Sequence, residues 1–232
     1  MSSHLKIVSG GAMRPVMAAA VPLFERANAA IVDIEFLLTS ALQKAVADGL
    51  AFDVAVLPRP ELDELVGAGK LVAETTADMA RSAIGVAVRA GAPKPDISTV
   101  ASFKRALQAA SSIAYSDGPS GAYIGTMLGR LGLEAEMKPK TRLTSRPVAE
   151  LLAAGTAEIG MQQIVAILPV QGAALVGPLP PELQNIIVYA AGISTAAQNR
   201  ATAQSFIDFM RGPVAADIIR AKGLEPGQVG VR

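Results

Sequence analysis

The chain contains no cysteine and no tryptophan, and its single histidine is His4, near the first residue. The absence of cysteine excludes disulfides, thiolate zinc sites and a cysteine nucleophile. One histidine close to a chain end makes neither a catalytic constellation nor a histidine metal site. The sequence also has no Walker loop, no dinucleotide fingerprint and no residue cluster with metal-ligand spacing. We therefore expect neither a metal nor a cofactor.

Aromatic residues and net charge are scarce as well. Six phenylalanines and three tyrosines make up 4% of the chain, and 21 basic residues balance 20 acidic ones to leave a net charge of +1. Proteins that bind nucleic acid need a surplus of basic residues for the phosphates, and many need rings that stack on bases. Nucleic acid is therefore not an expected partner.

No uninterrupted hydrophobic run is long enough to suggest a membrane span. The segment 159–181 has no charge, but glutamines, glycines and prolines interrupt it. The segment 15–24 is apolar, yet Glu25 and Arg26 follow it where a signal peptide stays neutral, and its apolar residues recur at helical spacing. The sequence as written thus shows no export signal. We expect a periplasmic protein if a leader has been removed, and a cytoplasmic one otherwise.

Hydrophobic residues make up 51% of the 232 positions, enough for a packed core. Strand-like apolar segments alternate with segments of helical periodicity along the whole chain. The expected strands are 5–8, 53–57, 82–88, 112–115, 158–162 and 185–191. The expected helices begin near 13 or cover 41–48, 60–68, 98–109, 146–154, 196–210 and 213–222, and one more opens within 116–121 and ends at 131. This alternation predicts an α/β protein with parallel sheets covered by helices.

A turn of very small residues, Ser9-Gly10-Gly11-Ala12, lies between the first expected strand and the first expected helix. A strand that turns through glycines into a helix presents unpaired backbone N–H groups at the positive end of the helix dipole. Such a turn is a favourable place for an anion. We therefore expect Ser9, Gly11 and Ala12 to bind a small anionic ligand.

Comparable turns precede three other expected helices. They are Leu37–Ser40, Ser116–Gly121, and Thr144-Ser145, which we expect to cap a helix from Arg146 to Ala154. Each turn alone is typical of an ordinary connection between a strand and a helix. Together they indicate one oxyanion pocket.

The order of these segments resembles the type II periplasmic solute-binding proteins, most closely the molybdate-binding proteins of bacterial ABC uptake systems. The resemblance extends over nearly the whole chain and is carried by 7–17, 38–57, 82–90, 113–132, 145–163 and 206–216. It implies two α/β lobes, 1–82 with 190–232 and 83–189, joined by two crossing strands that serve as a hinge. It further implies a ligand in the cleft between the lobes, delivery to a membrane permease, and a monomer.

The resemblance also assigns ligand positions in the first two loops. The serine of the family's first loop falls at Ala12, where the hydroxyl is missing although the backbone N–H groups remain. The serines of its second loop fall at Thr39 and Ser40, where hydroxyls are kept. Hydroxyl chemistry is thus implied for the second loop and lost from the first.

The third and fourth loops carry further implied contacts. The third-loop contact falls at Ser120, and Tyr123 matches a tyrosine in the following helix. The fourth-loop contact falls at Ser145, and its neighbour Arg146 matches a family arginine. The family tyrosine that closes over molybdate falls at Gln163, so a second specific contact has changed.

The replacements favour an organic carboxylate over molybdate. Arg14 lies at the start of the first helix, and a guanidinium binds a carboxylate through two parallel hydrogen bonds. The alternatives are that Arg14 is a solvated first-turn residue and that Arg146 forms a surface ion pair with Glu150, one helical turn later. Gln162 and Gln163 offer amide donors, but neighbouring strand residues face opposite sides, so one of the two points away.

Two classes of function stay open. The first is a binding protein that delivers a small oxyanion or carboxylate to an ABC-type transporter. The second is a cytoplasmic enzyme on the same scaffold, because aconitate isomerase, which moves a proton on a tricarboxylate, resembles this family. In that case Arg14 and Arg146 would hold carboxylates, and a serine, Tyr115 or Asp117 would lie near the moving proton.

Overall fold

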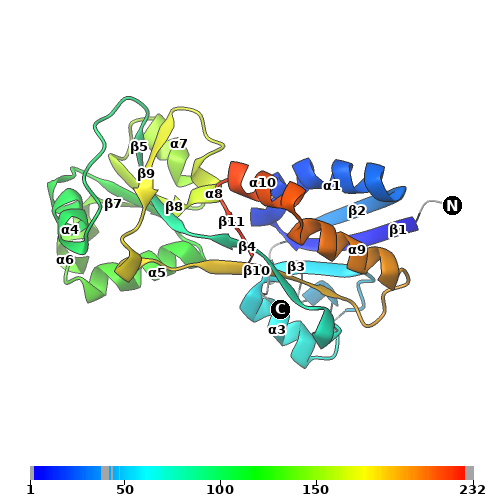
Figure 1. Ribbon diagram of the computed structural model, residues 1–232. Coiled ribbons are helices and arrows are strands. Elements are labelled where there is room, and N and C mark those ends of the chain that lie inside the picture. Colours follow the sequence, from blue (N-terminus) through cyan, green and yellow to red (C-terminus); the bar gives the residue numbers. More distant parts are fainter. Residues whose placement is uncertain (1–2, 38–41, 43, 47, 228–232) are drawn as a thin grey trace. The chain divides into compact units, whose positions relative to one another are not determined.

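The computed structural model describes residues 3–37, 42, 44–46 and 48–227. Two compact units make up the chain, Met1–Arg81 with Ile187–Arg232 and Ser82–Ile186 (Figure 1). The chain passes from the first unit to the second and back again, so the first unit is built from both ends of the sequence. Each unit has its own sheet with helices on both faces, which confirms the expected α/β class.

The first unit contains a six-stranded mixed sheet. Its strands follow the order β11 (Glu225–Pro226), β4 (Ala77–Ser82), β10 (Ile187–Ile193), β3 (Val54–Pro58), β1 (Ser3–Gly10) and β2 (Ala30–Leu37). β1 runs parallel to β2 and β3, whereas β10 is antiparallel to β3 and β11 to β4. The carboxyl ends of β1, β2 and β3 therefore lie at one edge of the sheet.

Helices cover both faces of this first sheet (Figure 1). α1 (Arg14–Asn28), α9 (Arg200–Arg211) and α10 (Pro213–Ala221) contact one another on one face, and α3 (Arg59–Gly67) packs on β3 and β10. Apolar residues spaced three and four apart make this possible: in α9 they are Ala203, Phe206, Ile207 and Met210, all buried. The rings of Phe24 and Phe206 meet edge to face with centroids 5.2 Å apart, which ties α1 to α9.

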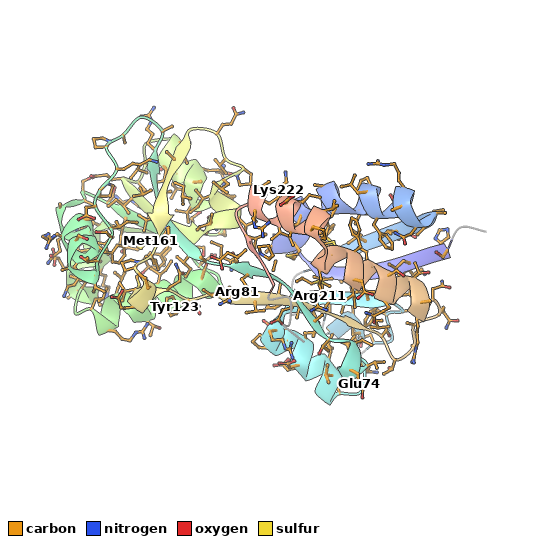
Figure 2. All side chains as sticks on the ribbon, viewed as in Figure 1. Glu74, Arg81, Tyr123, Met161, Arg211 and Lys222 are labelled. Atoms are coloured by element: carbon orange, nitrogen blue, oxygen red, sulfur yellow. The ribbon has the colours of Figure 1, made fainter. Side chains whose placement is uncertain are left out.

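The second unit contains a five-stranded sheet in the order β7 (Thr141–Thr144), β6 (Ile113–Ser116), β8 (Ile159–Gln163), β5 (Ile84–Arg89) and β9 (Ala173–Pro178). β6 is parallel to β7 and β8, and β5 is antiparallel to both of its neighbours. One core lies under α4 (Val100–Ala109), α5 (Pro119–Arg130) and α6 (Glu134–Met137), and includes Met161 (Figure 2). The other lies under α7 (Val148–Ala153) and α8 (Ile164–Ile167). Short 3-10 turns occur at Gly11–Met13, Ala73–Thr75, Lys138–Lys140 and Pro181–Leu183.

The expected cap of the helix after β7 is wrong. The helix begins at Val148 and not at Arg146, and Pro147 occupies its cap position. A residue that precedes proline is disfavoured in the helical region, so Arg146 stays outside. The hydroxyl oxygen of Thr144 instead accepts the Arg146 N–H at 3.0 Å. Thr144 thus stabilises the turn before the helix and leaves the helix itself uncapped by a hydroxyl.

A hydroxyl capping box does occur on another helix. In α4 the side chain of Thr99 accepts the N–H of Ser102 at 3.1 Å, and the Ser102 hydroxyl accepts the N–H of Thr99 at 3.0 Å. The sequence prediction placed the start of this helix at Ser98, so the cap lies one residue later than that start. This capping box therefore belongs to a helix that does not begin at one of the expected ligand turns.

Candidate functional site

The expected ligand turns gather at the carboxyl edge of each sheet, considered one unit at a time. In the first unit, Gly10 ends β1 and pairs with Leu37 at the end of β2. In the second unit, Ser116 ends β6 and pairs with Thr144 at the end of β7, while Gln163 ends the parallel neighbour β8. Parallel strands that end together bring their loops together. The glycine turn thus lies at the carboxyl edge of the first sheet, and the turns after β6 and β7 lie at the carboxyl edge of the second.

The glycine turn of the first unit has open space around it. A Cβ built on Gly10 or Gly11 would meet no atom within 4 Å, and Gly11 is exposed. Ser9, in contrast, is fully buried, and its hydroxyl donates to the carbonyl of Gly10 at 3.2 Å. Ala12 is half-buried. The turn therefore offers backbone rather than the Ser9 hydroxyl to its surroundings.

Arg14 is the first residue of α1 and is exposed. Its guanidinium carbon Cζ lies 4.0 Å from the centre of the ring of Phe36, which is the last residue but one of β2. No acidic residue lies in the first turn of α1, and among the described residues no carboxylate forms an ion pair with Arg14. A cation at the positive end of a helix is unfavourable on its own. This edge therefore carries positive charge that the described part of the chain does not neutralise.

The second-loop positions Thr39 and Ser40 lie outside the described residues. Their expected contribution of hydroxyl groups stays a prediction. The strand that leads to them, β2, ends at Leu37 beside Gly10, so the chain enters this loop at the same sheet edge as the glycine turn.

In the second unit the turn after β6 is built around two serines. Ser116 and Ser120 are nearly buried, and their hydroxyl oxygens lie 3.1 Å apart in a hydrogen bond. Gly121 makes the turn possible, because a Cβ there would lie 1.5 Å from the Ser116 carbonyl oxygen. The cap of α5 is Gly118, which has no side chain to cap the first N–H groups of this helix.

Ser145 and Arg146 follow β7 and are both exposed. Arg146 lies in an ion pair with Glu150, which is the alternative that the sequence allowed. The Arg146 side chain is 75% exposed, so water screens the pair and its net stabilisation is small. The structure thus gives this guanidinium a carboxylate partner within its own segment.

The side chains of Gln162 and Gln163 point to opposite faces of β8, as neighbouring residues of a strand do. The amide oxygen of Gln162 accepts the N–H of Val148 at 2.9 Å, so Gln162 provides a hydrogen-bond acceptor for the first residue of α7. Gln163 faces the other side of β8, is half-buried and occupies the cap position of α8. Of the two glutamines, Gln162 is thus the one engaged by the start of α7.

Tyr123 has a structural partner. Its hydroxyl donates to the carbonyl of Leu183 at 2.9 Å and accepts from Arg130 at 3.2 Å. These bonds connect α5 to the 3-10 turn at 181–183.

Asp117 and Tyr115 lie at the carboxyl end of β6. Asp117 is exposed and Tyr115 is half-buried, and the Asp117 N–H donates to the carbonyl of Thr144 at 3.0 Å.

Two carboxyl groups have lowered pKa values, and both lie away from these edges. The hydroxyl and N–H of Ser111 donate to Oε2 of Glu158 at 2.6 and 2.8 Å, which lowers the pKa of Glu158; Lys140 acts in the same direction. Ser111 and Glu158 precede β6 and β8, so this pair lies at the amino edge of the sheet. Hydrogen bonds from Ser98 lower the pKa of Asp96 in the loop before α4. Neither group marks acid or base chemistry at the candidate edges.

Two recesses of about 330 Å³ each occur elsewhere in the first unit. One lies at the amino edge of β1 and β3 and the other along β1 and β2, and Lys6 and Ala51 line both. The first contains the buried carboxylate of Asp53, which accepts the N–H groups of Lys6 and Gln198. These two bonds are structural, because they join the residue before β3 to β1 and to the segment before α9.

Comparison with known proteins identifies the family of this chain. Residues 5–225 match the family described as bacterial extracellular solute-binding protein, which is nearly the whole chain. The chain belongs to this family. This solute-binding protein is also similar to aconitate isomerase from a Pseudomonas species. The two are 31% identical over 229 residues, which cover 96% of this chain and 87% of the isomerase.

Solved structures place this solute-binding protein in the expected fold. A substrate-binding domain assigned to a molybdenum ABC transporter from Clostridium difficile superposes with a TM-score of 0.85, at 17% identity, over 98% of this chain and 100% of that one. The periplasmic molybdate-binding protein of Azotobacter vinelandii gives a TM-score of 0.73 at 20% identity, over 97% and 100% of the two chains. These likenesses confirm the two-sheet architecture of the periplasmic binding proteins.

Within 3–37, 42, 44–46 and 48–227, no three histidine or acidic side chains group in a way that would hold a metal ion. In the same part of the chain, none of the helices combines the length and apolar character needed to cross a bilayer.

Phe36 is the residue that sequence reasoning missed. A half-buried phenylalanine near the end of a strand is common, and no sequence signal links it to Arg14, 22 positions earlier. The tertiary structure does provide the link: Phe36 pairs with Ser9 near the end of β1, and its ring contacts the guanidinium of Arg14 at the start of α1.

Proposed function

We propose that this solute-binding protein binds a small organic carboxylate at the carboxyl edge of its first sheet, for delivery through an ABC-type transporter. The observation that carries the proposal is the exposed guanidinium of Arg14, at the start of α1 and beside the glycine turn. Periplasmic location, action as a monomer, and a two-lobed division at 1–82 with 190–232 and 83–189 are parts of this proposal.

Charge supports a carboxylate over a tetrahedral oxyanion. Arg14 adds a charged fork whose spacing matches the two oxygens of a carboxylate. The glycine turn adds backbone N–H donors, and the open space at Gly10 and Gly11 lets a ligand approach them closely. Ala12 provides no hydroxyl to such a ligand. We propose Ser120, Ser145 and Gln163 as the contributors from the second unit.

A second candidate function is isomerisation of aconitate. It is supported by the 31% identity to aconitate isomerase over 87% of that enzyme. The reaction removes a proton from a carbon beside the double bond and returns a proton to the other end of the allylic system, so it needs no oxidant or cofactor. Asp117, exposed at the carboxyl edge of the second sheet, and the half-buried Tyr115 are the candidate proton carriers.

Calorimetric titration tests the proposal. The probes are citrate, trans-aconitate, propane-1,2,3-tricarboxylate, molybdate and sulfate. We expect a tricarboxylate to bind more tightly than molybdate. We also expect Arg14→Ala to weaken its binding by about 2–4 kcal/mol, because Arg14, exposed in the free protein, would form with the bound ligand a charge pair shielded from water. Arg26→Ala is the matched control, because Arg26 is exposed in the last turn of the same helix.

Two results would change the assignment. Tight binding of molybdate that is insensitive to Arg14→Ala would refute the carboxylate proposal. Appearance of the cis isomer when the protein is incubated with trans-aconitate, followed by proton NMR, would establish the isomerase and decide between the two candidates. Exchange of the allylic proton with deuterium from D₂O would report the proton transfer itself.

A further inference from the structure

We propose that Phe36 is a positioning residue for Arg14, and that the pair sets the preference for planar carboxylates over tetrahedral oxyanions. The inference rests on the proposed function, because it concerns how Arg14 presents its charge to the ligand. Its physical basis is the contact between the Arg14 guanidinium and the Phe36 ring, with Cζ 4.0 Å from the ring centre.

The contact restricts the guanidinium. An arginine side chain has about 2 kcal/mol of rotamer entropy when it is free in solvent. A ring in van der Waals contact covers one face of the guanidinium and attracts its charge, while the N–H groups along the edge stay available. Those N–H groups form the fork that matches a carboxylate. Phe36 therefore holds Arg14 in a form that binds two coplanar oxygens.

The pairing of β2 with β1 fixes the backbone position of Phe36. Phe36 lies on β2, whose eight residues pair in register with β1, and its partner in that register is the buried Ser9. Glu35, the neighbouring carboxylate, points to the opposite face of the strand, because strand side chains alternate. Arg14 thus has an aromatic ring beneath it and no carboxylate from this strand to compete with a ligand.

A double-mutant cycle tests the pair. The variants are Phe36→Leu, Arg14→Ala and both together, titrated with propane-1,2,3-tricarboxylate, which has no double bond to isomerise, and with molybdate. We expect Phe36→Leu to weaken the tricarboxylate by about three- to thirty-fold, the range of a cation–π contact. Molybdate binding should stay within a factor of two, and Phe36→Leu should have no further effect once Arg14 is alanine.

Two control variants separate positioning from general loosening. Phe36→Tyr keeps the ring face and should retain the affinity and selectivity of the original chain. Phe209→Leu removes another half-buried ring of the first unit, one that packs on Phe24 and not on a cation, and should leave both affinities unchanged. Melting curves of the free variants identify any that fail to fold.

The outcomes distinguish the two proposals. If Arg14→Ala weakens the tricarboxylate and Phe36→Leu does not, the positioning role is wrong and the proposed function stands. The same conclusion follows if Phe36→Leu weakens binding equally with and without Arg14. If Arg14→Ala has no effect, or if no carboxylate binds, the proposed function fails and the role of Phe36 fails with it.

Discussion

Replacing Asp53 by alanine should destabilise the first unit strongly, although the residue lies away from the candidate ligand turns. Asp53 is 6% exposed, and its carboxylate accepts the N–H of Lys6 at 2.9 Å and that of Gln198 at 3.0 Å. These bonds join the residue before β3 to β1 and to the segment before α9, which are 47 and 145 positions away in the sequence.

The magnitude follows from the two donors that the substitution would leave without an acceptor. Each unsatisfied buried donor costs about 1–3 kcal/mol, and water reaches this recess, so we take the lower half of that range for each. The expected loss is about 3 kcal/mol in the free energy of unfolding, or about 6–12 °C in melting temperature for a chain of this size. Asp53→Asn keeps one acceptor oxygen but places an amide donor against the second N–H, so its loss should be smaller.

Urea unfolding followed by circular dichroism measures the loss as a lower midpoint at unchanged slope. The matched control is Asp217→Ala, an exposed aspartate paired with Arg220 at 3.0 Å, which should change stability by less than about 0.5 kcal/mol. If Asp53→Ala is no more destabilising than this control, the carboxylate does not join these segments and the reasoning is refuted.

Two further predictions concern the second unit. Gly121→Ala should destabilise by at least about 2 kcal/mol, because the added Cβ would lie 1.5 Å from the Ser116 carbonyl oxygen, whereas Gly125→Ala in the same helix meets nothing within 4 Å and should stabilise by about 0.5–1 kcal/mol; equal effects in thermal melts would contradict this. Since hydrogen bonds from Ser111 lower the pKa of Glu158 in the folded protein, they stabilise it above the ordinary glutamate pKa, and this stabilisation is lost as pH falls through the lowered pKa. Glu158→Gln should therefore cost about 1 kcal/mol or less at pH 7 and nothing at low pH, and a cost that does not vary with pH in urea melts would refute the assignment.

The sequence by itself determined the class of fold. Periodicity of apolar residues placed the six expected strands within a few positions of β1, β3, β5, β6, β8 and β10, because burial of one face needs the same spacing wherever the element lies. It did not predict β4, β7, β9 or β11. The small residues Ser9–Ala12 also located the junction between β1 and α1, since they separate an apolar strand from a segment of helical periodicity. Anion binding at this junction stays a prediction. The helix start before Pro147 was misjudged, although the proline that prevents an earlier start is visible in the sequence.

Only the tertiary structure decided what individual polar side chains do. The sequence pattern allowed either Gln162 or Gln163 to face a ligand, and it allowed Arg146 either to bind a ligand or to pair with Glu150. The tertiary structure pairs Gln162 with the start of α7 and Arg146 with Glu150. The contact of Arg14 with Phe36 depends on the register of β1 against β2. Pairing between strands is a long-range property, because any one-residue shift would turn Phe36 to the other face of the sheet. Local sequence therefore specifies the elements, and packing between distant segments specifies their partners.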